Sequence, residues 1–177
     1  MPETSSTQKT IFLTGLMGSG KSSVATVLAK SLCLPLVDLD AVICKEAGKS
    51  INEIFADEGE IAFRSLESAC LDRVASFSPS IIATGGGVVI AESNRRLMRE
   101  KGIIVNLTAP LPLILKRLSG ATDRPLYSDH DAEKRIRTLM EEREQFYADA
   151  DIRIDTDGKS VEDVAAYILK VLKGLHP

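Results

Sequence analysis

The chain has 177 residues, which is the size of a single domain. Hydrophobic residues make up 44% of it and charged residues 27%, so the sequence can fill a core and keep a polar surface. The formal net charge of −3 argues against a non-specific nucleic-acid-binding protein, whose surface is usually basic, and no apolar run approaches the roughly 18 residues of a membrane span. We therefore expect one domain over residues 1–177, with no nucleic-acid and no membrane partner.

Residues 1–9 are polar and lack the apolar core of a signal peptide, so we expect a flexible N-terminal tail there. Cys33, Cys44 and Cys70 are widely spaced and lie in apolar helical patterns, which favours reduced core thiols over disulfides or metal ligands. Both observations indicate a cytoplasmic protein.

Short apolar runs alternate along the chain with segments of helical periodicity. Strands that are apolar throughout and alternate with helices predict a parallel sheet that helices cover on both faces. The ligands of such a sheet bind at the carboxyl ends of its strands. The expected strands are residues 10–14, 36–39, 81–84, 103–107 and 152–155, and the expected helices are residues 22–32, 61–74, 111–118, 136–147 and 161–172.

The first expected strand leads into residues 15–22, which have the G-x-x-x-x-G-K-S pattern of a phosphate-binding loop. The glycines let backbone N–H groups approach phosphate oxygens, and the following helix points its positive N-terminal end at the same anion. Lys21 is suited to reach the β- and γ-phosphates, and the hydroxyl of Ser22 is suited to ligate Mg²⁺. Because a strand precedes the loop and a helix follows it, the pattern is not a chance glycine-rich turn.

Two carboxylates, Asp38 and Asp40, lie at the carboxyl end of the second expected strand. Residues two apart in an extended segment point to the same side, so both side chains are expected to face the phosphates. Asp38 would hold Mg²⁺ through water, a task for which the third strand offers no acid, and Asp40 would accept a proton from a substrate hydroxyl. Asp40 is equally suited to cap a helix that begins at Ala41, and the two roles are compatible.

Three consecutive glycines, Gly85, Gly86 and Gly87, follow the third expected strand. Each costs about 0.5–1 kcal/mol relative to alanine in regular structure, and a tight turn needs only one or two. The third indicates that a ligand approaches the backbone closely at this end of the sheet.

Residues 119–131 are polar, rich in turn formers and longer than most connections, so we expect a short lid. Arg124 lies within it, before Pro125, and is suited to stabilise charge on a transferring phosphoryl group. The alternative is an ordinary surface arginine.

Three other arginines are also candidates for ligand binding. Arg143 is in phase with an apolar stripe and needs an anion, which is either a substrate carboxylate or, as the pattern alone favours, an internal acid. Arg64 lies between two possible helix faces, so its direction is ambiguous. Arg117, near the expected lid, is suited either to stack on a nucleotide base or to cap the end of its own helix.

In combination, these motifs resemble the shikimate kinases, a family of small P-loop metabolite kinases. The P-loop alone is common to many families, but a Phe-Arg pair after an acidic helical turn, a triple glycine and an Arg-Pro-Leu lid are more specific. The resemblance extends over residues 10–172, and it rests on residues 15–22, 38–40, 54–64, 84–89, 123–127 and 142–147.

This resemblance implies an α/β fold of the P-loop class, with three α/β/α layers, a parallel five-stranded sheet and a short lid, like that of the nucleoside monophosphate kinases. The implied reaction is transfer of the γ-phosphate of ATP to the 3-hydroxyl of shikimate, which gives shikimate 3-phosphate and ADP on the way to chorismate and the aromatic amino acids. ATP and Mg²⁺ are the implied cofactors, shikimate and ATP are the implied partners, and a monomer is the implied state.

The resemblance also implies a role for each matching residue. Lys21, Asp40 and Arg124 would act in catalysis, and two arginines would clamp the shikimate carboxylate, because guanidinium pairs with carboxylate in a bidentate way. No residue is assigned in the adenine loop near residues 155–160. The implied ATP-binding residues are Gly18, Ser19, Gly20, Lys21, Ser22, Ser23, Arg117 (on adenine) and Arg124, the implied shikimate-binding residues are Asp40, Arg64, Gly85, Gly86, Gly87 and Arg143, and the implied metal ligands are Ser22 and, through water, Asp38.

Two other readings compete with this one. A gluconate or nucleoside monophosphate kinase has the same scaffold, but the triple glycine and the lid motif favour shikimate. A nucleotide-binding regulator without catalysis is the other alternative, and the presence of Lys21, Ser22, Asp40 and Arg124 argues against it.

Overall fold

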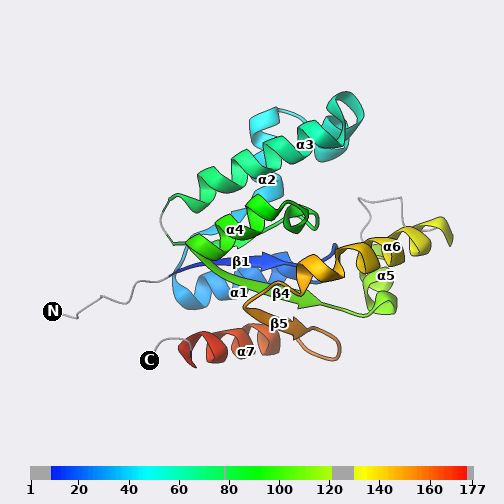
Figure 1. Cartoon of the computed structure of the whole chain (residues 1–177). Coiled ribbons are helices and arrows are strands. Elements are labelled where there is room, and N and C mark those ends of the chain that lie inside the picture. The colour runs from blue at the N-terminus through cyan, green and yellow to red at the C-terminus, as the bar shows by residue number, and fades with distance from the viewer. Residues whose placement is uncertain (1–8, 78, 121–129, 175–177) are drawn as a thin grey trace.

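Figure 1 shows the computed structural model of the chain, which describes residues 9–77, 79–120 and 130–174. Within these residues, one parallel sheet contains five strands in the order β2-β3-β1-β4-β5. The central strand β1 is buried along its whole length, which agrees with its mainly apolar sequence. The strands are β1 (Thr10–Thr14), β2 (Leu36–Asp38), β3 (Ile81–Ala83), β4 (Gly102–Thr108) and β5 (Ile152–Asp155).

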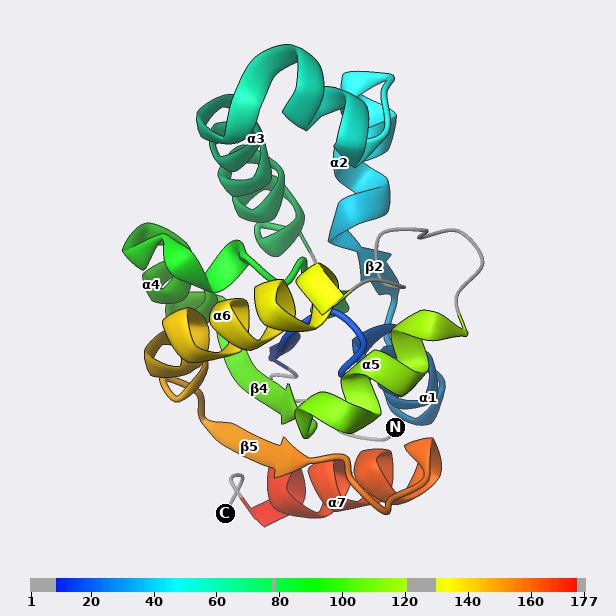
Figure 2. The same ribbon diagram turned by 90° about the vertical axis from the view of Figure 1, so that its right-hand side faces the viewer.

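Helices cover both faces of the sheet, as the alternation of elements predicted (Figure 2). Side chains alternate along each strand: Phe12 points into the core beneath one set of helices, and its neighbours Ile11 and Leu13 point into the core on the opposite face. Helices α1 and α7 cover the face of Ile11, and α3, α4 and α6 cover the face of Phe12. The helices are α1 (Lys21–Leu32), α2 (Leu39–Ala47), α3 (Ile51–Ala75), α4 (Glu92–Lys101), α5 (Leu111–Ser119), α6 (His130–Tyr147) and α7 (Val161–Gly174), with a short 3₁₀ helix η1 (Val88–Ile90) before α4.

Helices α2 and α3 pack side by side at the end of the molecule away from α7 (Figures 1 and 2). A capping box of Ser50 and Glu53 starts α3, with the Ser50 N–H donating to the Glu53 carboxylate at 2.7 Å. The helix is interrupted at Gly59, whose φ of 83° and ψ of 174° are not helical. This interruption divides α3 into a first segment that the sequence did not predict and a second segment that matches the expected helix over residues 61–74.

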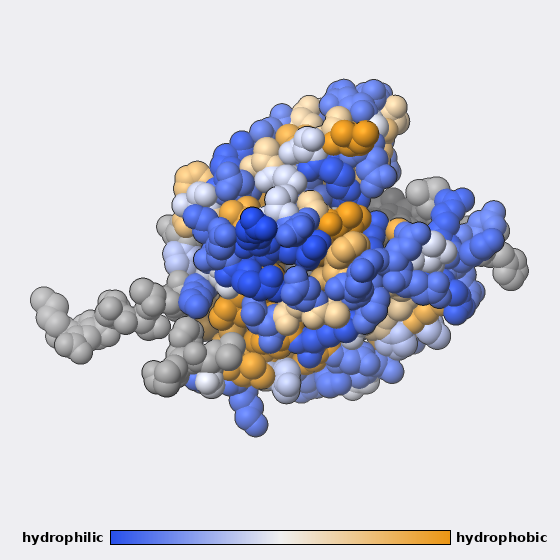
Figure 3. Space-filling model, viewed as in Figure 1, coloured by the Kyte–Doolittle hydropathy of each residue, from blue (hydrophilic) through white to orange (hydrophobic). Residues whose placement is uncertain are grey.

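The strands agree with expectation to within one residue, but α4 was not expected. Its sequence is mainly charged, and only Asn94 and Met98 are fully buried, so it has almost no apolar periodicity to detect. Hydrophilic side chains accordingly cover this part of the surface (Figure 3). The charged helix α4 on the face of Phe12 is therefore known from the structure and was not predicted from the sequence.

The expectations about the N-terminal tail, the lid and the cysteines are only partly tested by the described residues. Of residues 119–131, Ser119 ends α5 and α6 already includes 130 and 131, whereas 121–129, with Arg124, lie outside the described residues, as do 1–8 of the expected tail. The three cysteines are free thiols, but Cys33 is exposed at the end of α1 and is not a core thiol. In the described part of the chain, no helix is long and apolar enough to cross a membrane.

Candidate active site

The loop between β1 and α1 has a backbone that only glycine adopts easily. Gly15, Gly18 and Gly20 have φ values of 140°, 77° and 98°. A Cβ at Gly15 would also lie 2.3 Å from the carbonyl oxygen of Leu107, so this position has no room for a side chain. The loop therefore closes tightly and leads directly into the N-terminal turn of α1, which is an anion-binding arrangement.

Lys21 begins α1, and its side chain lies back over the loop. Its Nζ donates to the carbonyl oxygens of Gly15 at 2.8 Å and Leu16 at 3.0 Å. Ser22 and Ser23 follow in the exposed first turn, and Ser19 is buried in the loop with a hydroxyl that has no hydrogen-bond partner among the described residues. An ammonium, backbone N–H groups and hydroxyls therefore gather within one turn of the chain.

Arg117, on α5, connects this loop to the chain segment after β5. Its Nη1 donates to the carbonyl oxygen of Gly18 at 3.0 Å and to Oγ1 of the buried Thr156 at 3.2 Å. Both partners lie outside α5, so the alternative in which Arg117 caps its own helix is wrong. The guanidinium lies between the phosphate-binding loop and the segment that begins at residue 155, where an adenine site was expected.

The extended geometry expected for residues 38–40 is wrong, because α2 begins at Leu39, directly after β2. Asp38 is the N-cap of α2, since its Oδ1 accepts a hydrogen bond from the N–H of Ala41 at 3.1 Å. Asp40 is therefore not the cap and lies in the first helical turn. Its Oδ1 is 3.0 Å from the position that a Cβ at Gly85 would take, so the carboxylate faces the triple glycine.

The second segment of α3 brings a buried ion pair to the same glycine. Arg64 Nη1 lies 2.7 Å from Oε2 of Glu67, whose side chain is only 1% exposed. The other oxygen of Glu67, Oε1, has no hydrogen-bond partner in the described part of the chain and lies 3.0 Å from the same Cβ position at Gly85. Burial raises the pKa of Glu67 above its usual 4.5, Arg64 opposes this rise and the nearby Asp40 adds to it.

Helix α6 approaches the triple glycine from the other side. Tyr147 donates its hydroxyl to the carbonyl oxygen of Gly86 at 2.5 Å, and burial raises the pKa of Tyr147, with Arg143 beside it opposing the rise. A Cβ at Gly86 would lie 3.6 Å from Nη1 of Arg143. Arg143 forms no ion pair with any carboxylate of the described residues, so the internal acid that the pattern favoured is not found there.

The three glycines are needed for space and not for their backbone angles. None of them has a positive φ, yet a Cβ at Gly87 would lie 2.3 Å from Nη1 of Arg64. The sequence indicated that a ligand approaches this backbone closely, and in the structure side chains of the chain itself lie that close to it. Two guanidiniums, Arg64 and Arg143, and two carboxylates, Asp40 and Glu67, surround this turn, which is adjacent to the phosphate-binding loop: the Cβ position at Gly86 is 3.6 Å from the backbone N of Met17.

Comparison with known proteins decides which family has this arrangement. The family model described as shikimate kinase matches residues 17–173. The chain belongs to the shikimate kinase family. Its activity is accordingly that of a shikimate kinase, an ATP-dependent phosphotransferase of the pathway to the aromatic amino acids.

Individual relatives agree with the family match. A shikimate kinase of Geobacter metallireducens is 50% identical over 169 residues, which are 96% of this chain and 94% of the relative. One of Geobacter sulfurreducens is 51% identical over 160 residues, which are 90% of this chain and 88% of the relative. Among solved structures, the shikimate kinase of Acinetobacter baumannii in complex with shikimate has a TM-score of 0.89 and 33% identity, with 96% of both chains covered.

The same comparisons settle the competing readings. A gluconokinase of Sinorhizobium meliloti has a TM-score of 0.59 and only 17% identity, so it is similar in fold alone. The fold expected from the sequence is confirmed: an α/β P-loop fold with a parallel sheet in the strand order of the shikimate kinases.

Sequence reasoning missed two members of the cluster, Glu67 and Tyr147. A signal for Glu67 was present, because it lies at i+4 from Phe63 and three residues before Cys70, in the middle of an apolar stripe. A carboxylate at such a position needs a partner, and Arg64 at i−3 was within reach. Tyr147 was recognised only as part of the apolar stripe of α6, since no pattern shows where its hydroxyl points.

Proposed function

We propose that Asp40, Arg64, Arg143 and the Gly85–Gly87 turn bind shikimate, and that its 3-hydroxyl is the group phosphorylated. The observation that supports this most strongly is the placement of the two guanidiniums on the Gly86–Gly87 backbone, with the Asp40 carboxylate at Gly85. Two arginines that converge from α3 and α6 provide the four or more N–H donors that a carboxylate accepts. A hydroxy acid is therefore oriented with its carboxylate on the arginines and a hydroxyl on Asp40.

Asp40 would orient the acceptor hydroxyl and take its proton as the oxygen bonds to the γ-phosphorus and the bond to ADP breaks. Lys21 would bind the transferring phosphate, because its ammonium already lies over the loop that cradles the triphosphate. Residues Gly18–Ser23 would hold the phosphates through their backbone N–H groups. Arg117 would stack on the adenine, and its anchoring to Gly18 and Thr156 holds its guanidinium between the two loops.

The residues proposed for Mg²⁺, Ser22 and Asp38, fit that ion in their chemistry. They offer a hydroxyl and a carboxylate, both on exposed residues, and Mg²⁺ prefers oxygen ligands. The described residues contain no group of three or more His, Cys, Asp or Glu that would hold a metal ion by themselves. This suits Mg²⁺, which commonly takes one or two protein ligands and completes its shell with phosphates and water, and which supplies charge neutralisation when bound.

The remaining proposals rest on the sequence and the family resemblance. Residues 119–131 would serve as the lid that brings Arg124 onto the phosphates. The chain would act as one domain over residues 1–177, as a monomer, in the cytoplasm.

The test is the release of ADP from Mg·ATP with shikimate, run beside gluconate, AMP and a reaction without acceptor. Turnover is expected with shikimate alone, and NMR of the product should place the phosphate on the 3-oxygen. Asp40→Asn should lower kcat by about 100-fold or more, the usual contribution of a positioned base, and change ATP affinity by less than about twofold. An equal loss of ATP binding would instead make Asp40 a structural residue.

A second comparison tests the carboxylate clamp within α6. Arg143→Ala should raise the KM for shikimate by about 100-fold, since a lost charge-assisted pair is worth about 2–3 kcal/mol, and the KM for ATP should stay the same. Arg137→Ala is the matched control, because Arg137 lies on the same helix but is exposed and, within the described residues, pairs only with Glu133 at 2.8 Å. Equal effects of the two substitutions would refute the clamp.

A further inference from the structure

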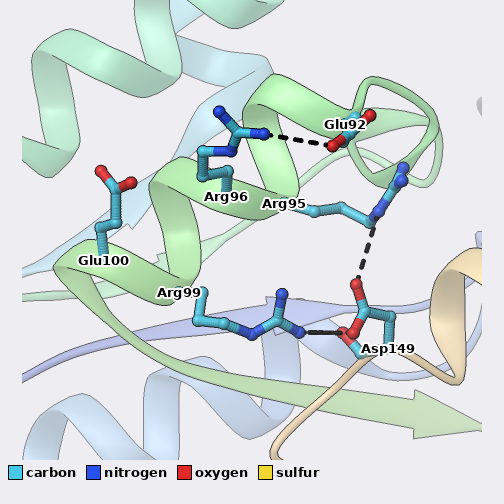
Figure 4. A pocket seen from close by; sticks show the side chains of 6 residues that line it. All are labelled: Glu92, Arg95, Arg96, Arg99, Glu100 and Asp149. Atoms are coloured by element: carbon cyan, nitrogen blue, oxygen red, sulfur yellow. Dashed lines mark hydrogen bonds and ion pairs between the residues drawn. The ribbon is translucent and has the colours of Figure 1, made fainter.

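A surface pocket lies between α4 and the chain that follows α6, away from the proposed active site. Its charges balance, so it has no surplus to attract an ion (Figure 4). Five of these six charged side chains are engaged with each other instead: Arg96 pairs with Glu92 at 3.3 Å, and Arg95 and Arg99 both point at Asp149. The pocket is therefore not a ligand site but the visible edge of an ion-pair network. It is lined by Glu92, Arg95, Arg96, Arg99, Glu100 and Asp149.

Arg95 differs from the other arginines of α4 because it also binds the backbone of η1. Its Nη1 donates to the carbonyl oxygens of Val89 at 2.6 Å and Ile90 at 3.0 Å. The η1 helix follows Gly87 directly, and it is hydrogen-bonded back to the triple glycine, with the N–H of Ile90 donating to the carbonyl oxygen of Gly87 at 3.1 Å. Arg95 therefore holds the far end of the turn that begins with the proposed shikimate-binding glycines.

The same guanidinium is attached to the end of α6. It lies 4.8 Å from the ring centroid of Phe146, and its Nε lies 3.6 Å from Oδ2 of Asp149. Phe146 and Asp149 flank Tyr147, whose hydroxyl donates to Gly86, and Phe146 is three residues after Arg143. Only 16% of the Arg95 side chain is exposed, so these contacts are largely shielded from water.

We propose that Arg95 is a positioning residue for the acceptor site, because it joins the Gly85–Ile90 turn to the C-terminal end of α6. This inference rests on the proposed function of Arg143 and the triple glycine. The turn provides the backbone that lines the acceptor site, and α6 provides the guanidinium of Arg143. The spacing between the turn and α6 therefore decides how well the carboxylate of the acceptor fits. The planar fork of arginine suits the task, since it reaches two carbonyls and a carboxylate at once, which an ammonium on a flexible stem does not do.

Loss of the Arg95 side chain should weaken binding of the acceptor and not of the nucleotide. The contacts recorded for Arg95 are with η1, Phe146 and Asp149, and none is with the phosphate-binding loop or with Arg117. Displacement of α6 against η1 therefore moves Arg143 relative to Gly86 and leaves the nucleotide groups in place. A general loss of folding would impair both substrates equally.

The experiment compares Arg95→Ala with two neighbours on α4. Arg96→Ala removes a side chain that is 71% exposed and paired with Glu92, and Arg99→Ala removes the other partner of Asp149, which has no recorded contact with η1. We expect Arg95→Ala to raise the KM for shikimate by about tenfold, the effect of losing one charged hydrogen bond, with the KM for ATP changed by less than about twofold. Both control variants should keep both KM values within about twofold.

Arg95→Lys provides the same readout in a variant that keeps the charge, and it decides the matter if Arg95→Ala does not fold. Lysine should raise the KM for shikimate by about threefold or more, because it keeps the charge opposite Asp149 but not both carbonyl bonds. A wild-type KM for shikimate in folded Arg95→Ala or Arg95→Lys, or equal changes for both substrates, would overturn the inference. Arg143→Ala, measured in parallel, separates failure of the proposed acceptor site from failure of the positioning role. An unchanged KM for shikimate in Arg143→Ala refutes the acceptor site itself. A raised KM in Arg143→Ala with an unchanged KM in the Arg95 variants refutes only the positioning role of Arg95.

Discussion

The hydrogen bond from Tyr147 to Gly86 is the link between α6 and the triple glycine whose removal can be tested with the least disturbance. Tyr147→Phe deletes one oxygen from a residue that is 5% exposed and leaves the carbonyl oxygen of Gly86 without that donor. An unsatisfied buried polar group costs about 1–3 kcal/mol. For a chain of this size each kcal/mol lowers Tm by about 2–4 °C, so we expect a decrease of about 2–12 °C.

The free energy of unfolding would be measured by urea denaturation followed by circular dichroism, because the chain has no tryptophan to report by fluorescence. Tyr167→Phe is the matched control: Tyr167 is on α7 and 49% exposed, and its hydroxyl has no hydrogen bond to any residue that the structure describes. Tyr147→Phe should also raise the KM for shikimate by a few-fold and leave the KM for ATP unchanged. If Tyr147→Phe and Tyr167→Phe had the same stability and the same KM for shikimate, the reasoning about this link would be wrong.

Two further predictions concern the other side of the same turn. Gly87→Ala places a Cβ 2.3 Å from Arg64 Nη1 and should raise the KM for shikimate at least about tenfold, because it displaces that guanidinium. Gly174→Ala is the control, since a Cβ at Gly174 meets open space, and it should leave this KM unchanged. Equal KM values for shikimate in the two variants would contradict the prediction. Burial raises the pKa of Glu67 above 4.5, so Glu67 binds its proton more tightly in the folded than in the unfolded chain. The stability that this proton contributes is therefore complete below pH 4.5 and is lost as the pH rises through the raised pKa. Denaturation from about pH 4 to about pH 8 should therefore show the wild type losing stability relative to Glu67→Gln, and a constant difference between them would refute the sign.

The sequence predicted the sheet well because its signal is local. Residues 10–14 and 103–107 are mainly apolar, as is typical of strands buried on both faces, and the loop at residues 15–22 has a fixed spacing. The local geometry expected for residues 38–40 was wrong, since these residues suit the end of a strand as well as the start of a helix. Sequence reasoning also failed at α4, whose contribution is a set of ion pairs and carbonyl contacts without apolar periodicity.

The candidate site shows a different limit of prediction. Residue types and spacing identified Arg64 and Arg143 as unusual, but their meeting at one backbone turn depends on how α3 and α6 pack in the fold, which is a long-range feature. Tyr147 was missed for the same reason, because its partner Gly86 is 61 residues away in the sequence. Glu67 was missed although its partner Arg64 is only three residues away. Arg124 stays a prediction, since it lies outside the described residues.

The strand order has a consequence for how the chain is made. Among the five strands of the sheet, β1 is synthesised first, yet it lies in the centre: Thr10 bonds to Ser80, 70 residues away, and Thr14 bonds to Asn106, 92 residues away. The nucleotide loop therefore has no rigid flanks until β3 and β4 have left the ribosome, and pairings of such high contact order form slowly. A nascent chain that ends before β4 should not retain ATP, although it contains the whole loop, so nucleotide binding reports near-complete folding of the molecule and not the presence of its N-terminal motif.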